Sequence, residues 1–88
     1  MIQLFKIRTV GVVVFLIEGI VENSVVGRGV EIRKGAVVKN CVVLGHSVVG
    51  EGVHLECQVI DKWAQVLHAK EIIATPDRPG YVRRDDIL

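Results

Sequence analysis

Aliphatic residues recur along this chain at intervals of five, six and six residues, and the set of intervals repeats every 17 residues. The repeat runs without insertion from residue 21 to residue 71. Three columns result, namely Val21, Val38, Leu55 and Ile72, then Val26, Val43 and Ile60, then Ile32, Val49 and Val66. Self-similarity at a fixed period is typical of a solenoid, whose coils bury their apolar faces only against one another.

A second set of positions, two residues before each later anchor, carries mostly small side chains. Its members are Ser24, Val30, Ala36, Cys41, Ser47, Val53 and Ala64, whereas Gln58 and Lys70 depart from the rule. Residues two apart in a strand share one face, so each row of residues presents two inward side chains. The pattern therefore predicts an all-β fold, a single-stranded left-handed parallel β-helix of the hexapeptide-repeat type, with about three coils of 17 residues.

Three further columns mark the predicted corners between the rows. They are formed by Asn23, Asn40 and Cys57, by Gly29, His46 and Trp63, and by Gly35, Gly52 and Ala69. Gly and Asn tolerate a positive φ better than other residues, so we expect left-handed backbone at these corners. Because Cys, Trp and Ala end the columns, the corners are expected to loosen toward the C-terminus.

This register divides the chain into three parts. Residues 16–74 are predicted to form the β-helix. Residues 1–15 do not follow the 17-residue register, and we expect an irregular, apolar N-terminal segment there. Residues 75–88 are expected to form a turn that contains Pro76 and Pro79, followed by a C-terminal strand or tail, because proline removes a donor from a strand ladder.

Composition and charge exclude several classes of function. The formal net charge of +1 gives no general attraction to nucleic acid or to an anionic membrane. The apolar segment Val10–Ile17 is too short to span a bilayer, which takes about 20 residues. Cys41 and Cys57 fall in different columns and suit a reducing compartment without a disulfide. We therefore expect a cytoplasmic protein that binds neither nucleic acid nor membrane.

The residues that often carry chemistry are scattered over the predicted coils. His46, His54 and His68 share no column, so we assign no metal site. We interpret the cations on outward positions as a solvated face rather than an anion site, and they are Arg28, Arg33, Lys34 and Lys62. The sequence contains no Gly-rich phosphate loop between a strand and a helix. The residues by themselves therefore assign no catalytic group and no cofactor.

The wording of the repeat resembles one family. The stretches that carry the resemblance are Leu16 to Val26, Gly35 to Leu44, Val59 to Lys62 with its Asp61-Lys62 ending, and the closing turn from Thr75 to Pro79. They are similar to the C-terminal β-helix of bacterial glucose-1-phosphate adenylyltransferase (ADP-glucose pyrophosphorylase), above all its regulatory-type subunit in glycogen biosynthesis. The resemblance covers residues 16–88.

This resemblance implies a non-catalytic module. In that family an N-terminal nucleotidyltransferase domain makes ADP-glucose and pyrophosphate from ATP and glucose 1-phosphate, and the β-helix serves subunit association and allosteric regulation. These 88 residues hold no counterpart of the Gly-rich nucleotide loop or the metal-binding aspartate of that domain. This chain alone is therefore not expected to be an enzyme, and an adenylyltransferase catalytic subunit is an implied partner.

One binding feature is implied in the closing strand. Val82-Arg83-Arg84-Asp85 resembles the family's strand of the form Val-x-Lys-Asp, in which the cation helps to bind a phosphorylated activator. The resemblance assigns Arg84, with Arg83 beside it, as candidate residues for the phosphate of a phosphorylated sugar effector. Arginine suits this role because its guanidinium donates two parallel hydrogen bonds to phosphate.

A small hexapeptide-repeat acyltransferase is the alternative function. Such enzymes have the same fold and use a histidine as general base. They usually add further coils and a loop that covers the substrate, whereas the repeat here has no insertion. An open solenoid also exposes unpaired ladder groups at both ends. Because Val10–Ile17 is apolar, we expect self-association through the first end.

Overall fold

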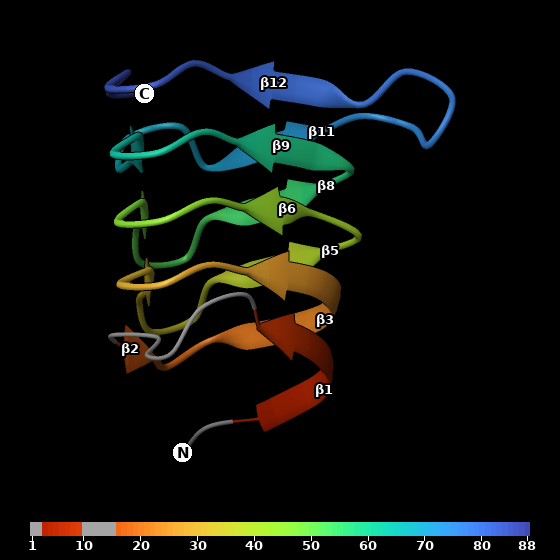
Figure 1. Ribbon diagram of the computed structural model, residues 1–88, viewed down its shortest axis with the longest axis vertical. Coiled ribbons are helices and arrows are strands. Elements are labelled where there is room, and N and C mark those ends of the chain that lie inside the picture. The colour runs from red at the N-terminus through yellow and green to blue at the C-terminus, as the bar shows by residue number, and fades with distance from the viewer. Residues whose placement is uncertain (1–2, 10–15) are drawn as a thin grey trace.

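The computed structural model describes residues 3–9 and 16–88, which form a left-handed parallel β-helix (Figure 1). The strands are β1 (Gln3–Thr9), β2 (Leu16–Ile17), β3 (Ile20–Val26), β4 (Glu31–Ile32), β5 (Val37–Lys39), β6 (Val42–Val43), β7 (Val48–Val49), β8 (His54–Glu56), β9 (Gln58–Ile60), β10 (Gln65–Val66), β11 (Glu71–Ile73) and β12 (Gly80–Val82). The described residues include no helix that could cross a membrane. The predicted fold class is confirmed.

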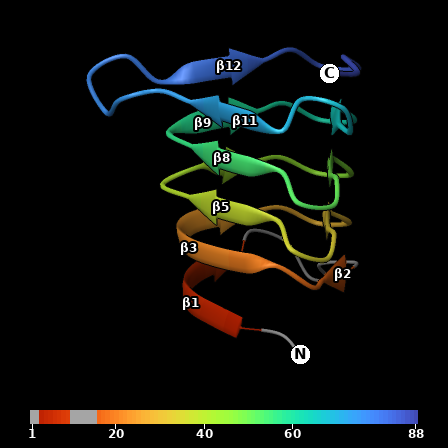
Figure 2. The ribbon, with the colours of Figure 1, turned by 180° about the vertical axis from the view of Figure 1, so that it is seen from behind.

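The strands line three faces of a prism. One face holds β5, β8 and β11, which Figure 2 shows one above another, and a second face holds β6, β9 and β12. Strand β3 runs across the corner between these faces and pairs with both β5 and β6. The third face is a separate sheet of β10, β7, β4 and β2. All these pairs are parallel, and Val21, Val38, Leu55 and Ile72 are successive partners in the 17-residue register.

The interior is built from the predicted anchors and small residues. Every anchor is fully buried except Ile72 in the last coil, which is partly buried. The small-residue positions from Ser24 to Ala64 are buried as well. Because each coil contributes only a single layer of inward side chains, the core exists only where coils stack on one another.

Gln58 is the large exception among the small inward residues. Its amide Nε2 donates to the Glu56 carbonyl over 3.1 Å, and the side chain is buried. The space for this side chain comes from Gly80, its partner in the next coil, because a Cβ on Gly80 would overlap the Gln58 amide. One missing side chain therefore compensates for the oversized neighbour one coil earlier.

The corner columns have the backbone that the sequence predicts. Positive φ values occur at Asn23, Asn40, His46, Cys57 and Trp63 (48–64°) and at Gly29, Gly35 and Gly52 (71–77°). Ala69, the predicted continuation of the third column, has no positive φ, since its Cβ disfavours the left-handed region. Asp85, with φ 65°, adds a corner that the sequence analysis did not predict.

The N-terminal boundary of the repeat is corrected by the structure. Strand β1 pairs with β3 from Gln3 opposite Ile20 to Thr9 opposite Val26, so residues 3–9 do follow the 17-residue register. Ile17 pairs with Ile32, an offset of 15 residues. The path from Thr9 to Ile17 is two residues longer than its counterpart in the next coil, and the path from Ile17 to Val21 is two residues shorter. This compensation hid the repeat from a comparison at a constant offset.

Residues 10–15 lie outside the described residues. The apolar segment on which the sequence analysis based self-association falls largely within them.

The C-terminal residues continue the solenoid with a changed register. Tyr81 pairs with Val59 and Val82 with Ile60, so the offset in this coil is 22 residues instead of 17. The five extra residues lie at the corner between β11 and β12, where Thr75 and Arg78 form an antiparallel bridge. The prolines predicted to form a turn thus form the corner of one further coil.

Tyr81 and Asp61 tie this further coil to the one before it. The Tyr81 hydroxyl donates to Asp61 Oδ2, and this hydrogen bond is the main cause of two pKa shifts. It lowers the pKa of Asp61 from its ordinary value of 3.8 and raises the pKa of Tyr81 from its ordinary value of 10.0. A lowered carboxyl pKa stabilises the fold only above the ordinary value, and a raised phenol pKa stabilises it only below the ordinary value.

Replacement of Tyr81 by Phe is therefore expected to lower stability between these two limits and to matter less beyond them. The difference from the wild-type chain should shrink as the pH falls below 3.8 or rises above 10.0. Urea midpoints measured across the pH range would check this. A difference that stays constant with pH would show that Tyr81 contributes packing alone.

Candidate functional site

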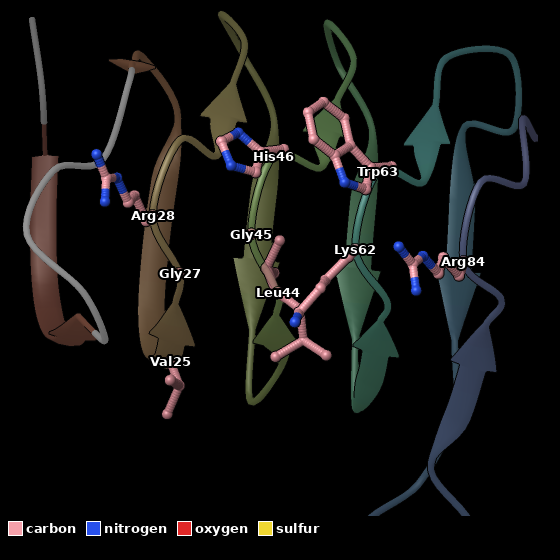
Figure 3. Close-up of a pocket in the computed structure, with 10 residues that line it drawn as sticks. Val25, Gly27, Arg28, Leu44, Gly45, His46, Lys62, Trp63 and Arg84 are labelled. Atoms are coloured by element: carbon pink, nitrogen blue, oxygen red, sulfur yellow. The ribbon is translucent and has the colours of Figure 1, made fainter.

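One groove on the outside of the solenoid gathers three cations and two aromatic rings, and we call it the cationic groove (Figure 3). Its volume is about 510 Å³. It is lined by Val25, Gly27, Arg28, Val43, Leu44, Gly45, His46, Lys62, Trp63 and Arg84. These residues come from successive coils, so the groove is a product of stacking rather than of one loop.

The three cations lie in one column beside a corner of the prism. Gly45 occupies the step of this column between Arg28 and Lys62, and Arg84 follows Lys62 in the final coil. Adjacent parallel strands lie about 4.8 Å apart, so the backbones of Lys62 and Arg84 are about one such step apart. In Figure 3 the Lys62 side chain reaches back over the coil that carries Gly45, and Arg84 reaches back toward the coil of Lys62.

Backbone hydrogen bonds hold this column in register. In each coil the left-handed corner residue donates its amide to the carbonyl of a column residue in the coil before. The bonds are His46 N to Arg28 O (2.9 Å), Trp63 N to Gly45 O (3.2 Å) and Asp85 N to Lys62 O (3.2 Å). The corner conformation therefore sets where the cations emerge.

Two aromatic rings form the wall beside the cations. The imidazole of His46 and the indole of Trp63 are stacked, with ring centroids 4.3 Å apart and an angle of 12° between the planes. The His46 ring also lies over Gly29, where a Cβ would come within 2.5 Å of Nδ1. The imidazole is thus held between the backbone of one coil and the indole of the next, while Trp63 stays 50% exposed.

The lining of the groove contains positive charge without a neutralising carboxylate. Three formal positive charges and one imidazole line it, and none of its residues is Asp or Glu. Asp61 lies near Arg84 and Lys62, and both contribute to the lowered pKa of its carboxyl, after the larger effects of the Tyr81 and Lys62 hydrogen bonds. Because the Asp61 carboxylate accepts those hydrogen bonds, the groove keeps excess positive charge.

Such a lining suits the binding of an oxyanion. Guanidinium and ammonium groups donate charge-assisted hydrogen bonds to phosphate or sulfate oxygens. The same lining offers no hydroxyl, thiol or carboxylate as a nucleophile. The chemistry that the groove supports directly is therefore binding, with His46 as the single titratable base.

The candidate effector residues have different surroundings. Arg84 lines the groove together with Arg28 and Lys62. Arg83 does not line it, and its Nε lies 3.2 Å from Asp86 Oδ2 in an exposed ion pair. Of the two, Arg84 is the residue that the fold brings next to other cations.

The cations interpreted as a solvated face are divided between two places. Arg28 and Lys62 enter the groove, whereas Arg33 forms an ion pair with Glu31 and Lys34 lies exposed at another corner. The sequence analysis missed the link between Lys62 and Arg84 because the five-residue insertion shifts the last coil. The signal available was the recurrence of a cation just before each left-handed corner residue.

The remaining histidines and cysteines lie away from the groove. His54 contacts Glu56 in β8, with 2.7 Å between Nε2 and Oε2, and His68 is exposed. Cys41 and Cys57 are free thiols, as predicted. Burial raises the pKa of the Cys41 thiol, which lies 3.1 Å from the Lys39 carbonyl as a hydrogen-bond donor. Both cysteines pack as small buried residues.

Comparison with known proteins agrees with this architecture. A family model described as GlmU-like, C-terminal hexapeptide, matches residues 6–80, which is most of the chain. No curated protein and no solved structure shows a significant match. The repeat, the stacked parallel coils and this match together show that the chain belongs to the GlmU-like C-terminal hexapeptide family.

Proposed function

We propose that this chain is a non-catalytic, regulatory β-helix module related to glucose-1-phosphate adenylyltransferase, and that its cationic groove binds a phosphorylated sugar effector. The observation that carries the proposal is the position of Arg84. The residue that the family resemblance assigns to an effector phosphate lies in one groove with Arg28 and Lys62. Clustered cations without an adjacent carboxylate in the lining favour an anionic ligand over a neutral one.

Removal of Arg84 tests this proposal. Arg84→Ala is expected to weaken the binding of glucose 6-phosphate by about tenfold, because a hydrogen bond to a charged group contributes about 1.5–3 kcal/mol. Isothermal titration calorimetry at low ionic strength measures the change. Arg83→Ala is the matched control, since it removes the same side chain one residue away from an ion pair outside the groove.

Two outcomes would count against the proposal. Equal affinities for the wild-type chain and Arg84→Ala would remove Arg84 from the site. A similar loss in Arg83→Ala would indicate a general effect of net charge rather than a groove, and higher salt would then weaken both variants alike.

An acyltransferase is the second candidate, and two observations favour it. The chain belongs to a hexapeptide family, and His46, a residue type that serves as general base, lines the same groove. The groove lies along the outside of the coil without a covering loop among its lining residues. Tight binding of acetyl-CoA, with no binding of sugar phosphates in the same titration, would support the enzyme over the regulatory module.

Association with another chain belongs to the proposed role. Among the described strands β1 pairs with β3 alone, so its outer edge has no strand partner there. An unpaired edge is a ready template for a further strand. We therefore expect this end of the solenoid to receive a second copy of the chain or an adenylyltransferase catalytic subunit.

A further inference from the structure

We propose that His46 acts as a proton switch for the cationic groove, so that oxyanions bind more tightly when its imidazole is protonated. The inference rests on the proposed anion site and adds its regulation. Imidazole is the side-chain group that ordinarily changes charge between about pH 5 and 8. A proton on His46 would add a fourth positive charge to a groove that already holds Arg28, Lys62 and Arg84.

The geometry lets protonation change the charge of the ring without moving it. The imidazole is held against Gly29 on one side, and the Trp63 indole stacks on the other side. An imidazolium over an indole face is stabilised by the negative face of the aromatic system. The stack therefore accepts the proton in place, and the new charge is delivered to the groove.

The charged neighbours set the direction of the coupling. Arg28, Lys62 and Arg84 share the groove with His46 and disfavour a further positive charge while the groove is empty. Asp85 follows Trp63 in the corner column and is the nearest acidic residue along that column. A bound dianion offsets the repulsion from the cations. Anion binding and His46 protonation must then strengthen each other by the same factor.

Sulfate is the probe that separates this effect from titration of the ligand. Phosphate esters change charge near pH 6 themselves, whereas sulfate remains dianionic over the whole range. Calorimetric titration of the full chain with sulfate is expected to show about fivefold tighter binding at about pH 5.5 than at about pH 8. The factor is that expected for one added unit charge at contact distance in a solvated groove.

Two matched variants assign the effect. His46→Asn removes the titratable ring and keeps a side chain that tolerates the left-handed corner, so the dependence of sulfate affinity on pH should vanish. His68→Asn changes an exposed histidine outside the groove and should keep the wild-type dependence. Far-UV circular dichroism of each variant confirms that the solenoid is folded.

Trp63 supplies an independent readout because it is the only tryptophan in the sequence. A protonated imidazole stacked on indole quenches its fluorescence, so the emission should fall as the pH drops. Sulfate should shift this transition to higher pH, and His46→Asn should remove it.

The possible outcomes separate this inference from the proposed function. Sulfate binding that is independent of pH would overturn the proton switch and leave the anion site standing. A dependence that survives in His46→Asn would assign the proton to another group and also overturn it. Failure of both sulfate and glucose 6-phosphate to bind at any pH would overturn the anion site itself.

Discussion

Replacement of Ile60 by Ala is expected to lower the free energy of unfolding by about 2–5 kcal/mol, which is the usual result of removing a large aliphatic side chain from a packed core. Ile60 is 0% exposed and lies between its partners Val43 and Val82 in the coils before and after it. Neither neighbour can close the resulting space without moving a whole coil, because each is held by its own ladder of hydrogen bonds. In a domain of 88 residues this loss is a large share of the total stability.

The matched control is Val59→Ala in the same strand. Val59 precedes Ile60 in β9 and points outward, with intermediate burial. Its truncation is expected to lower the unfolding free energy by no more than about 1 kcal/mol. Urea unfolding followed by far-UV circular dichroism measures both variants. Similar losses for the two would contradict the inward and outward alternation on which the β-helix core depends.

Replacement of Gly45 by Glu is expected to weaken oxyanion binding to the cationic groove by about 100-fold or more. The new carboxylate would enter the cation column next to Lys62, which reaches over this coil in Figure 3. It would compete with the ligand for the ammonium group and would repel the bound anion, and like charges in contact cost several kcal/mol. Sulfate and glucose 6-phosphate titrations should both report the loss.

The backbone at Gly45 accepts a side chain, so this variant tests the site rather than the fold. Gly45 does not have a positive φ, and a Cβ there would meet only the Arg28 carbonyl, at 3.2 Å. Gly45→Gln is the matched control, because it fills the same space without the charge. A strong loss in Gly45→Glu with a smaller loss in Gly45→Gln would support electrostatic recognition. Equal losses would show that the step at Gly45 matters only as empty space.

Much of the fold could be predicted because its repeat is local. A core position such as Val38 is marked by the aliphatic residues 17 positions before and after it, and all of them occupy the same layer. A corner such as Asn40 is marked by residues that tolerate a positive φ. In both cases spacing and residue type report the same structure, so the prediction needs no knowledge of distant contacts.

The candidate site was harder to predict because its parts obey different offsets. Arg28 and Lys62 are separated by two regular repeats, whereas Lys62 and Arg84 are separated by a coil with five extra residues. The family resemblance drew attention to Arg84, but no pattern in the residues connected it with Lys62. The stack of His46 on Trp63 depends on Gly29 beneath it, and a column of unlike residues does not reveal such packing.

The sequence by itself thus determined the coil length, the inward columns and the corners of the regular turns, because a solenoid converts residue spacing directly into position. Only the tertiary structure decided how the two irregular ends join these turns. The pairing of β1 with β3 and of β12 with β9 places Gln3–Thr9 and Gly80–Val82 in the stack. The physical reason is that strand ladders select partners by hydrogen bonding and packing, so lengthened or shortened corners are tolerated wherever the rows still align.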